Sequence, residues 1–577
     1  MNRPLPRQVV DAAQMAELCS RAATAPTGER LALLCAELAL DEGSAVQRLA
    51  DYLGMEAMDA AGLATLQADF QLASFAECKR RRAVLARPKP PMEDVCSLVL
   101  ICHDPFDLDV QAWFEPLIEY QAPRDFARVL VRAQDFEHFL SVAEGELRAL
   151  DSVVALSEGD GHATDRGTEA NIQLSMASIE ATANSTVRLV DSTLYDALKS
   201  GASDIHFELQ GTELVIRYRL DGVMQTIKRI EGLEVANQVI SRIKVLADLD
   251  IAERRIPQDG RFRAELDRRG IDFRVSVMPN VSGEDAVLRI LDRKHLTNGG
   301  SSLTLDALSF SEDVKGFIRQ SSHLPYGLLL VTGPTGSGKT TTLYAAISEI
   351  NSGLDKIVTI EDPIEYQLQS VLQIPVNERK GLTFAKGLRS ILRHDPDKIM
   401  VGEIRDSETA QIAVQAALTG HQVFTTVHAN NVFDVIGRFS NMGVDSYSLV
   451  AALSGIMAQR LVRKVCPKCA TWHSASREDW IAHRMSEDLW TSGGGKLRRA
   501  QGCPECRGTG YRGRAAIAEI LGIDDEMKDL LVQQAPITTL KRFARERGFK
   551  SLRDSAVSLA LAGVTTLDEI NRVTPAH

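Results

Sequence analysis

The sequence predicts an α/β protein in which a mainly parallel sheet is preceded by a smaller α+β sheet domain and a mostly helical N-terminal region. Three observations lead to this prediction. The apolar run Gly327 to Val331 passes through a glycine-rich turn into a helical segment. After it, short apolar strands alternate with helical segments, as they do in parallel α/β sheets. Before it, apolar and polar residues alternate with period two between Ile205 and Leu220, which indicates strands of a sheet with one apolar face.

The overall composition limits the classes of protein to which this chain can belong. Its 577 residues predict three or four domains of about 100 to 200 residues each. The hydrophobic fraction of 44% and the charged fraction of 25% are ordinary for globular domains. A net charge of −11 argues against a surface built for phosphate backbones, so we expect no nucleic-acid partner. The apolar runs are too short for a secretory signal or a membrane span, which favours a cytosolic protein.

Shifts in composition divide the chain into seven segments. Residues 156–185 are polar and rich in glycine, serine and threonine, which is typical of an exposed linker, and residues 295–305 form a second predicted linker. The predicted domains are an N-terminal region (1–155), a sheet domain (186–294), a parallel α/β domain (306–465), a tetracysteine subdomain (466–513) and a helical C-terminal subdomain (514–577).

The N-terminal region shows helical apolar spacing in LALLCAELAL and VQRLADYLGM. The run Cys96 to Asp107 indicates a strand that ends in a turn. We interpret the basic cluster Lys79 to Arg82 as a solvated helix face rather than a binding site. This region is therefore predicted to fold, but it carries no motif that indicates a chemical function.

The sheet domain is predicted to begin with a helix that stops at Ser200-Gly201 and to continue as strands. Period-two alternation places Arg217 and Arg219 on the polar face of one strand, opposite the apolar face. Two further arginines, Arg274 and Arg289, lie on later strands. A solvated charged face is the more common explanation of such a pattern. A cationic surface that binds an anionic ligand is the alternative.

The glycine-rich turn matches the phosphate-binding pattern G-x-x-x-x-G-K-[ST]. Glycines allow successive backbone N–H groups to point into one concavity, and the following helix adds unpaired N–H groups and the positive end of its dipole. Lys339 can reach the β and γ phosphates, and the Thr340 hydroxyl can bind Mg²⁺. We therefore expect ATP and Mg²⁺ as ligands, with the nucleotide held by Gly333, Pro334, Thr335, Gly336, Ser337, Gly338, Lys339, Thr340 and Thr341.

Three later strands each run into polar residues at the end where ligands bind in open α/β sheets. The strand Lys398 to Val401 is followed by Glu403, our first choice for holding Mg²⁺ with Thr340 and for orienting the attacking water. A second strand leads to Glu361, Asp362 and Glu365, of which we prefer Glu361 as a second carboxylate that polarises water.

The third of these strands leads to His428, flanked by Thr425 and Thr426. An imidazole at this edge of the sheet could sense the γ-phosphate or couple it to a neighbouring chain. A structural hydrogen-bonding role is the alternative for a single histidine. Phosphoryl transfer also requires positive charge, yet the α/β domain offers mainly Lys339 and the metal. We therefore expect arginines of the sheet domain, from the same chain or the next subunit, to complete the site.

Four of the nine cysteines form the pairs CPKC and CPEC. Two C-x-x-C pairs present four thiolates tetrahedrally, and Zn²⁺ is the usual ion in a reducing compartment. A redox motif and an iron–sulfur site are the alternatives. The other five cysteines are expected to be reduced and inert, and the tail from Asp524 to Val573 is expected to be helical with a turn near Gly563. The predicted zinc ligands are Cys466, Cys469, Cys503 and Cys506.

These motifs together resemble the secretion ATPase family, which comprises the type II secretion and type IV pilus assembly ATPases. The resemblance covers Ser203 to Gly563 through SDIHFE, RYRLDG, ERRIPQDGR, the phosphate loop, TIEDPIE, DPDKIMVGEIRD, TGHQVFTTVHANN and both cysteine pairs. The histidine-containing segment departs from the family pattern, because Asn431 replaces an acidic residue.

The resemblance implies a RecA-like motor domain behind a PAS-like sheet domain, in a homo-hexamer that hydrolyses ATP at its subunit interfaces. Arg274 and Arg289 resemble the family's phosphate-sensing arginines. The family implies a cytoplasmic protein that is peripheral at the inner membrane, where it is held by an inner-membrane platform protein and a cytoplasmic docking protein. The N-terminal region is interpreted as a domain that docks a partner. The alternatives are a DNA-transfer or nucleic-acid motor of the same superfamily and a scaffold that binds nucleotide without hydrolysing it.

Overall fold

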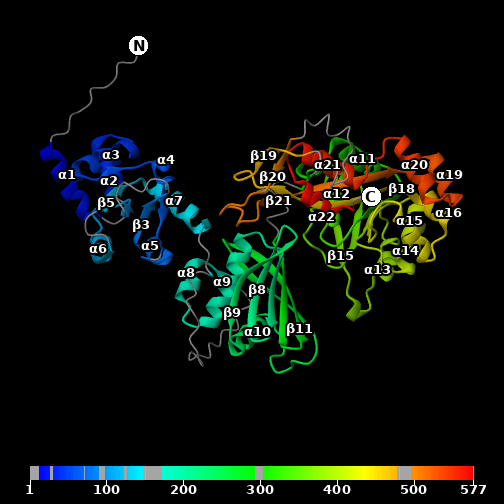
Figure 1. The fold of residues 1–577 in the computed structure, drawn as a ribbon, viewed down its shortest axis with the longest axis horizontal. Coiled ribbons are helices and arrows are strands. Elements are labelled where there is room, and N and C mark those ends of the chain that lie inside the picture. The colour runs from blue at the N-terminus through cyan, green and yellow to red at the C-terminus, as the bar shows by residue number, and fades with distance from the viewer. Residues whose placement is uncertain are drawn as a thin grey trace, which may run out of the picture. The chain divides into compact units, whose positions relative to one another are not determined.

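The computed structural model describes most of the chain, in two compact units that we describe separately (Figure 1). One unit contains Met1–Tyr218 and Gln225–Ile290, and the other contains Arg219–Met224 and Leu291–His577. The described residues are 12–25, 30–70, 72–89, 98–121, 126–146, 150, 172–292, 303–476, 480 and 496–575.

The N-terminal region combines helices with one five-stranded sheet of order β1-β5-β4-β3-β2. The prediction of a mostly helical region with some strand is confirmed, and β4 lies within the predicted strand segment, directly before a turn. The exposed Lys79 and Arg80 lie in the last turn of α5, as expected for a solvated helix face. The strands are β1 Glu56–Ala57, β2 Leu66–Ala68, β3 Ala83–Pro88, β4 Leu98–Cys102 and β5 Phe126–Leu130, and the helices are α1 Ala12–Thr24, α2 Arg30–Leu38, α3 Glu42–Leu53, α4 Ala60–Leu63, α5 Phe75–Arg81, α6 Leu108–Gln121 and α7 Ala133–Glu146.

The sheet domain is a seven-stranded sheet of order β6-β10-β11-β12-β7-β8-β9. One face is apolar and buried, with Ile205 and Phe207 on β7 facing inward, and charged residues alternate onto the other face. The strands are β6 Ile172–Leu174, β7 Asp204–Gln210, β8 Glu213–Leu220, β9 Val223–Glu231, β10 Gln258–Leu266, β11 Arg269–Asn280 and β12 Gly283–Leu291, and the helices are α8 Met176–Ala181, α9 Ser185–Lys199 and α10 Leu233–Leu246.

The predicted first linker is wrong over its C-terminal part. β6 and α8 lie within residues 156–185, and β6 pairs in parallel with β10, with Leu174 opposite Leu266. Leu174, Met176 and Ile179 are buried, so tertiary packing orders a stretch that its polar composition alone does not identify. Residues 151–171 lie outside the described residues, as does most of the second predicted linker.

The second unit is built on a seven-stranded sheet of order β15-β14-β16-β17-β13-β18-β21, in which only β21 runs antiparallel to its neighbour. The predicted fold class is confirmed, and β13 and β16 lie where the apolar runs place them. The strands are β13 Gly327–Thr332, β14 Ile357–Glu361, β15 Leu372–Pro375, β16 Lys398–Val401, β17 Gln422–Val427, β18 Leu453–Val465 and β21 Tyr511–Gly522, with a separate pair β19 Thr471–Ser474 and β20 Lys496–Arg499.

Helices cover both faces of this sheet, because α14 packs on the face that carries Leu330 of β13 and α12 packs on the face that carries Leu329. Every residue of β13 is buried, as expected for a central strand with helices on both sides. The helices are α11 Glu312–Ser322, α12 Lys339–Ile350, α13 Phe384–Ile391, α14 Ser407–Leu418, α15 Asp434–Asn441, α16 Ser446–Ala452, α19 Asp525–Val532, α20 Ile537–Glu546, α21 Leu552–Leu561 and α22 Leu567–Val573, with the short 3₁₀ turns η3 Leu305–Ala307 and η4 Glu378–Lys380.

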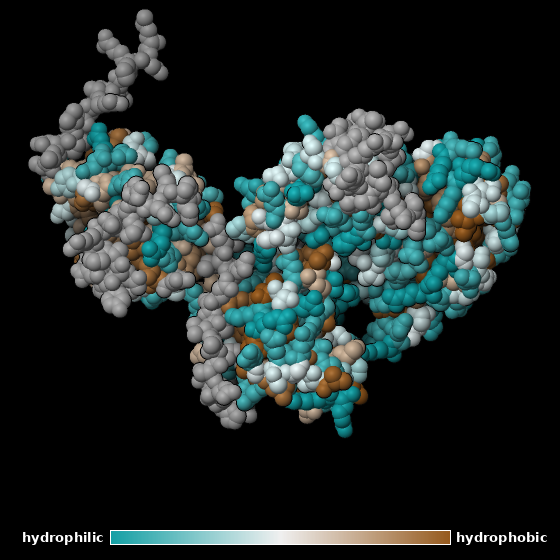
Figure 2. Space-filling view, viewed as in Figure 1, coloured by the Kyte–Doolittle hydropathy of each residue, from teal (hydrophilic) through white to brown (hydrophobic). Residues whose placement is uncertain are grey.

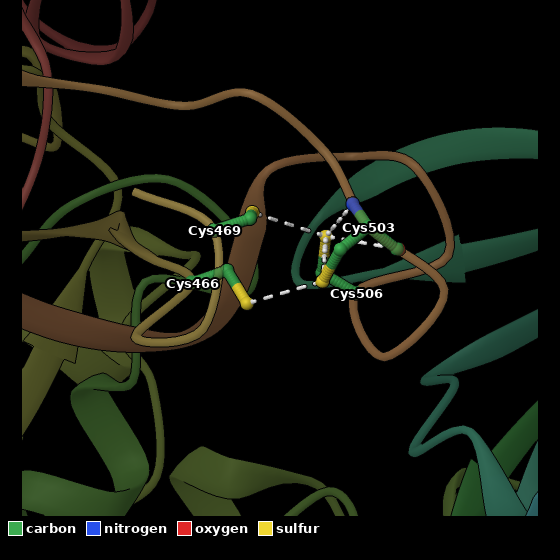
Figure 3. A group of neighbouring side chains, drawn as sticks. All are labelled: Cys466, Cys469, Cys503 and Cys506. Carbon is green, nitrogen blue, oxygen red and sulfur yellow. Dashed lines mark hydrogen bonds between the residues drawn. The ribbon is translucent and has the colours of Figure 1, made fainter. Parts of the chain in front are cut away.

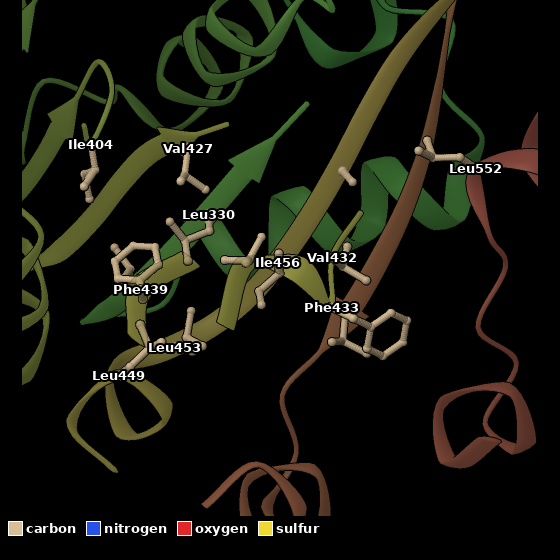
Figure 4. Packing of buried hydrophobic residues seen from close by; sticks show 14 of the residues in the cluster. Leu330, Ile404, Val427, Val432, Phe433, Phe439, Leu449, Leu453, Ile456 and Leu552 are labelled. Atoms are coloured by element: carbon tan, nitrogen blue, oxygen red, sulfur yellow. The ribbon is translucent and has the colours of Figure 1, made fainter. Parts of the chain in front are cut away.

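The predicted boundary at residues 513 and 514 is wrong, because β21 crosses it. β21 pairs with β18 from Gly455 opposite Gly522 to Val465 opposite Tyr511, so this strand completes the sheet of the α/β domain. The helical tail begins after it, at α19, and turns at Gly563 as expected. Its helices share the core of the sheet, where Leu552 belongs to the same apolar cluster as Leu330 and Ile456 (Figure 4).

Among the described residues, the structure contains no helix that is long and apolar enough to cross a bilayer. In the view of Figure 2, hydrophilic residues cover most of the visible face of the second unit, and hydrophobic residues form separate patches.

Candidate nucleotide site

The phosphate loop connects the end of β13 to the start of α12, as the sequence predicts. Gly333, Gly336 and Gly338 have φ values of 144°, 76° and 87°, which residues with a side chain rarely adopt. Gly338 is the N-cap of α12, and no side chain caps this helix. The first N–H groups of α12 therefore remain available to an anion. Pro334 and Thr335 are exposed at the tip of the loop.

Lys339 lies inside the loop rather than in solvent. Its Nζ donates hydrogen bonds to the carbonyl oxygens of Gly333 at 2.9 Å and Pro334 at 3.1 Å. Burial lowers the pKa of the Lys339 ammonium, and the negative charge of Glu403 opposes this shift. The loop therefore holds its cation close to the carboxylate that the sequence singles out.

Glu403 and His428 meet at the carboxyl edge of the sheet. Glu403 follows β16, His428 follows β17, and the two strands are adjacent and parallel. Glu403 Oε2 lies 3.4 Å from His428 Nε2. Only 15% of the Glu403 side chain is exposed, whereas 43% of the His428 side chain is exposed. The imidazole can therefore contact both Glu403 and a molecule in solution.

Arg405 is a site residue that the sequence reasoning missed. Its guanidinium contacts Glu403 Oε1, and its Nη1 lies 4.0 Å from Asp362 Oδ2 at the end of β14. The hydrogen bond to Glu403 raises the pKa of Arg405. The expectation that this domain offers mainly Lys339 as a cation is therefore incomplete. The sequence contains this arginine in GEIRD, two residues after Glu403, directly after the strand Lys398 to Val401.

Glu361 faces a buried cluster of side chains instead of solvent. It is 2% exposed, and its oxygens accept hydrogen bonds from the Tyr344 hydroxyl, from Thr359 Oγ1 at 2.5 Å and from Gln373 Nε2 at 3.1 Å. Burial raises the pKa of the Tyr344 hydroxyl, and the negative charge of Glu361 raises it further. A group that polarises water must contact it, and Glu361 is buried whereas Glu365 is exposed. The structure therefore does not favour Glu361 over Glu365 for this role.

Arg274 and Arg289 both lie on the outward face of the sheet domain. Arg274 on β11 is directly opposite Arg261 on β10, so two guanidinium groups occupy neighbouring positions on this face. The Arg289 side chain is 58% exposed, and its Nε donates to Asp204 Oδ1 at 3.1 Å. Both arginines therefore lie on the polar face of the sheet, where Arg289 is exposed and Arg274 is half-buried.

The four paired cysteines form one cluster in which all four sulfur atoms lie within 4.8 Å of one another (Figure 3). Cys466 and Cys503 are 3.9 Å apart through their sulfurs, and Cys469 and Cys506 are 3.8 Å apart. Burial raises the pKa of Cys506, but N–H donors from Cys503 and Gly510 outweigh it and lower this pKa to about 6. A thiolate of this kind is a zinc ligand, so the four residues fit a structural Zn²⁺ site.

Of the five scattered cysteines, four lie in the described residues and are free thiols. Burial raises the pKa of Cys78 and of Cys102 to about 12, which keeps these thiols protonated and unreactive, as expected. Cys96 lies outside the described residues.

Comparison with known proteins identifies the family to which this chain belongs. Among solved structures, the Legionella pneumophila ATPase DotB is 21% identical with a TM-score of 0.48, over 66% of this chain and 94% of that one. The type II secretion system protein E of Pseudomonas aeruginosa is 44% identical over 388 residues, 67% of this chain and 75% of that protein. The type IV pilus assembly ATPase PilB of the same species is 39% identical over 427 residues, 74% of each chain. A family model described as "Type II/IV secretion system protein" matches residues 180–572. The chain therefore belongs to the type II/IV secretion system protein family and is an ATPase of the group that includes the type II secretion and type IV pilus assembly ATPases.

Proposed function

We propose that this ATPase is Mg²⁺-dependent, forms a homo-hexamer and converts hydrolysis into mechanical work that moves protein subunits in type II secretion or type IV pilus assembly. The observation that carries the proposal is the meeting of the phosphate loop, Glu403 and His428 at one edge of the parallel sheet. This edge is where open α/β sheets bind their ligands.

The residues of the loop have distinct roles in this proposal. The backbone N–H groups of residues 333–341 bind the phosphates, and Lys339 leaves the Gly333 and Pro334 carbonyls to bind the β and γ phosphates. Thr340 and Glu403 hold Mg²⁺, directly or through its water ligands. When bound there, the metal would offset the negative charge that develops on the phosphates during transfer.

Glu403 also orients the attacking water in this proposal. Its two oxygens are held on one side by His428 and on the other by Arg405, so the carboxylate has a defined orientation. The partly exposed imidazole of His428 is placed to detect whether a γ-phosphate is present.

The sheet domain supplies the remaining positive charge through Arg274 and Arg289. Their outward position on the sheet supports this role, because an arginine that acts on a neighbouring subunit must be accessible. The tetracysteine cluster holds Zn²⁺ in a structural role, since all four positions are sulfur ligands and none remains for a substrate.

The proposed location is the cytoplasmic face of the inner membrane, where the protein is peripheral and bound through partners. These partners are an inner-membrane platform protein, which receives the mechanical work, and a cytoplasmic docking protein, which binds the N-terminal region. The names of the relatives, a type II secretion protein and a pilus assembly ATPase, support this choice over a nucleic-acid motor.

The test measures ATPase turnover of the purified full-length protein with each candidate partner. We expect stimulation by the cytoplasmic domains of a platform protein and none by single-stranded or duplex DNA at physiological salt. Binding to nucleic acid would depend steeply on salt through counterion release, so the measurement is repeated at two salt concentrations. Stimulation by DNA and none by the platform would contradict the proposal. Turnover that persists in excess EDTA would contradict Mg²⁺ dependence alone.

A further inference from the structure

A buried glutamine lies directly against the phosphate loop. β13 and β18 pair in parallel, and Thr332, the last residue of β13, lies opposite Ala458. The next residue of β18, Gln459, therefore lies beside the start of the phosphate loop. Gln459 is 2% exposed. It is more than 100 residues from the loop in sequence, and the strand register alone brings it there.

Both polar atoms of the Gln459 side-chain amide form hydrogen bonds. Its Nε2 donates to the carbonyl oxygen of Ser337 at 2.8 Å, and its Oε1 accepts from Thr342 Oγ1 on the first turns of α12 at 2.8 Å. A carbonyl oxygen can only accept, so the NH₂ group must face Ser337. The amide therefore connects the loop to the helix that follows it.

The loop backbone also fits closely around this residue. A Cβ on Gly333 would lie 2.3 Å from the Gln459 backbone oxygen, and a Cβ on Gly338 would lie 2.9 Å from its Nε2. Two glycines of the phosphate-binding pattern thus leave the space that Gln459 occupies. This requirement adds to the positive φ angles that already favour glycine at both positions.

The hydrogen bond to Ser337 has a consequence on the opposite side of the peptide. In a trans peptide the C=O and the following N–H point in opposite directions. Because Gln459 holds the Ser337 carbonyl toward β18, the Gly338 N–H is turned away from β18. Gly338 is the N-cap of α12, where N–H groups bind phosphate.

We propose that Gln459 is a positioning residue for nucleotide binding: it fixes the Ser337–Gly338 peptide and the start of α12, so that the loop is already in its phosphate-binding form before ATP arrives. The inference rests on the proposed phosphate loop. Gln459 acts through Ser337 and Thr342 and does not touch the nucleotide.

The test compares nucleotide affinity in the full-length protein carrying Gln459→Met, which keeps the length of the side chain and removes both hydrogen bonds. We expect ADP and ATP to bind about tenfold more weakly, by a similar factor, because the loop binds phosphates common to both and a buried carbonyl is left unsatisfied. Titration calorimetry with Mg²⁺ present measures both affinities.

Gln422→Met is the matched control. Gln422 is also fully buried, and its Nε2 donates to the Ser321 carbonyl at 3.1 Å, away from the loop. This control should lose thermal stability to a similar degree but bind nucleotide as the wild type does. If the Gln422 and Gln459 variants bound nucleotide equally weakly, Gln459 would contribute only to general stability. This result would overturn the inference.

A second pair of variants covers the case in which Gln459→Met does not fold. Thr342→Val removes the hydroxyl that orients the amide, whereas Thr342→Ser keeps it, so we expect severalfold weaker binding only in the valine variant. Wild-type affinity in both would overturn the inference. Lys339→Ala distinguishes failure of this inference from failure of the site assignment. If Lys339→Ala loses nucleotide binding and Gln459→Met does not, the role of Gln459 is wrong. If both variants bind nucleotide as the wild type does, the phosphate loop is wrongly assigned.

Discussion

His428 Nε2 lies 3.4 Å from Glu403 Oε2, across the ends of two adjacent parallel strands. The other oxygen of Glu403 contacts Arg405, so the carboxylate is held between an imidazole and a guanidinium. A carboxylate with both oxygens oriented in this way is ready to position a metal ion or a water molecule. The first prediction tests this role.

Glu403→Gln should retain nucleotide binding and lose hydrolysis, because an amide keeps the shape of the side chain but not its negative charge. Lys339→Ala should weaken nucleotide binding and abolish turnover, since it removes the cation inside the loop. Affinity and steady-state turnover are measured separately for each purified variant. Wild-type turnover in both would remove the basis for the catalytic assignment.

Alanine at Arg274 and Arg289 should reduce turnover by roughly 10³-fold or more if they act as arginine fingers. The affinity for nucleotide should change much less, because the phosphate loop is intact. Arg229→Ala is a suitable control, since this arginine of the same sheet domain forms an exposed ion pair with Glu213. Unchanged turnover in the double variant would show that the two arginines belong to a solvated face. Light scattering of the same samples measures the mass of the assembly and so tests the predicted hexamer.

The tetracysteine cluster should bind about one equivalent of zinc per chain, as elemental analysis of purified protein can measure. Cys466→Ser should lose the metal and lower the unfolding temperature, because Cys466 follows β18 and Cys506 precedes β21, the strands that the metal would hold together. Cys78→Ser, at a buried cysteine outside the cluster, should keep the zinc. A fully folded protein that contains no zinc would rule out the structural site.

The buried Asp191 on α9 should make stability depend on pH. Burial raises the pKa of its carboxyl to about 6, against the attraction of Arg242, which lowers it. The unfolded value is about 3.9. Between these values the folded state keeps a proton that the unfolded state releases, so the associated stability is present below about pH 4 and is lost as the pH rises to about 6.

Asp191→Asn removes this titration and should therefore stabilise the protein relative to wild type more at pH 8 than at pH 4. The expected difference is between about 2 and 3 kcal/mol, because a shift of about two pKa units is worth roughly 1.4 kcal/mol per unit and the unfolded carboxyl is already partly ionised at pH 4. Calorimetric unfolding at both pH values measures it. Asp525→Asn, at a fully exposed aspartate, should show no such difference. A stability gain that is equal at the two pH values would contradict the assigned titration.

The sequence by itself determined the features that depend on neighbouring residues. The phosphate loop, the strand Lys398 to Val401 and the paired cysteines each follow from a local pattern, because backbone periodicity and turn chemistry are set within a few residues. The parallel order of the strands, which the sequence predicts, also places Glu403 and His428 at the same edge of the sheet.

The tertiary structure alone decided which distant side chains meet. Gln459 lies beside Ser337 because β18 pairs with β13 in one register, and Glu361 is buried because Tyr344 and Gln373 surround its carboxylate. β6 and β21 likewise belong to their sheets because they pair with the distant strands β10 and β18. Strand register and burial are set by the packing of the whole domain, and no local pattern contains that information.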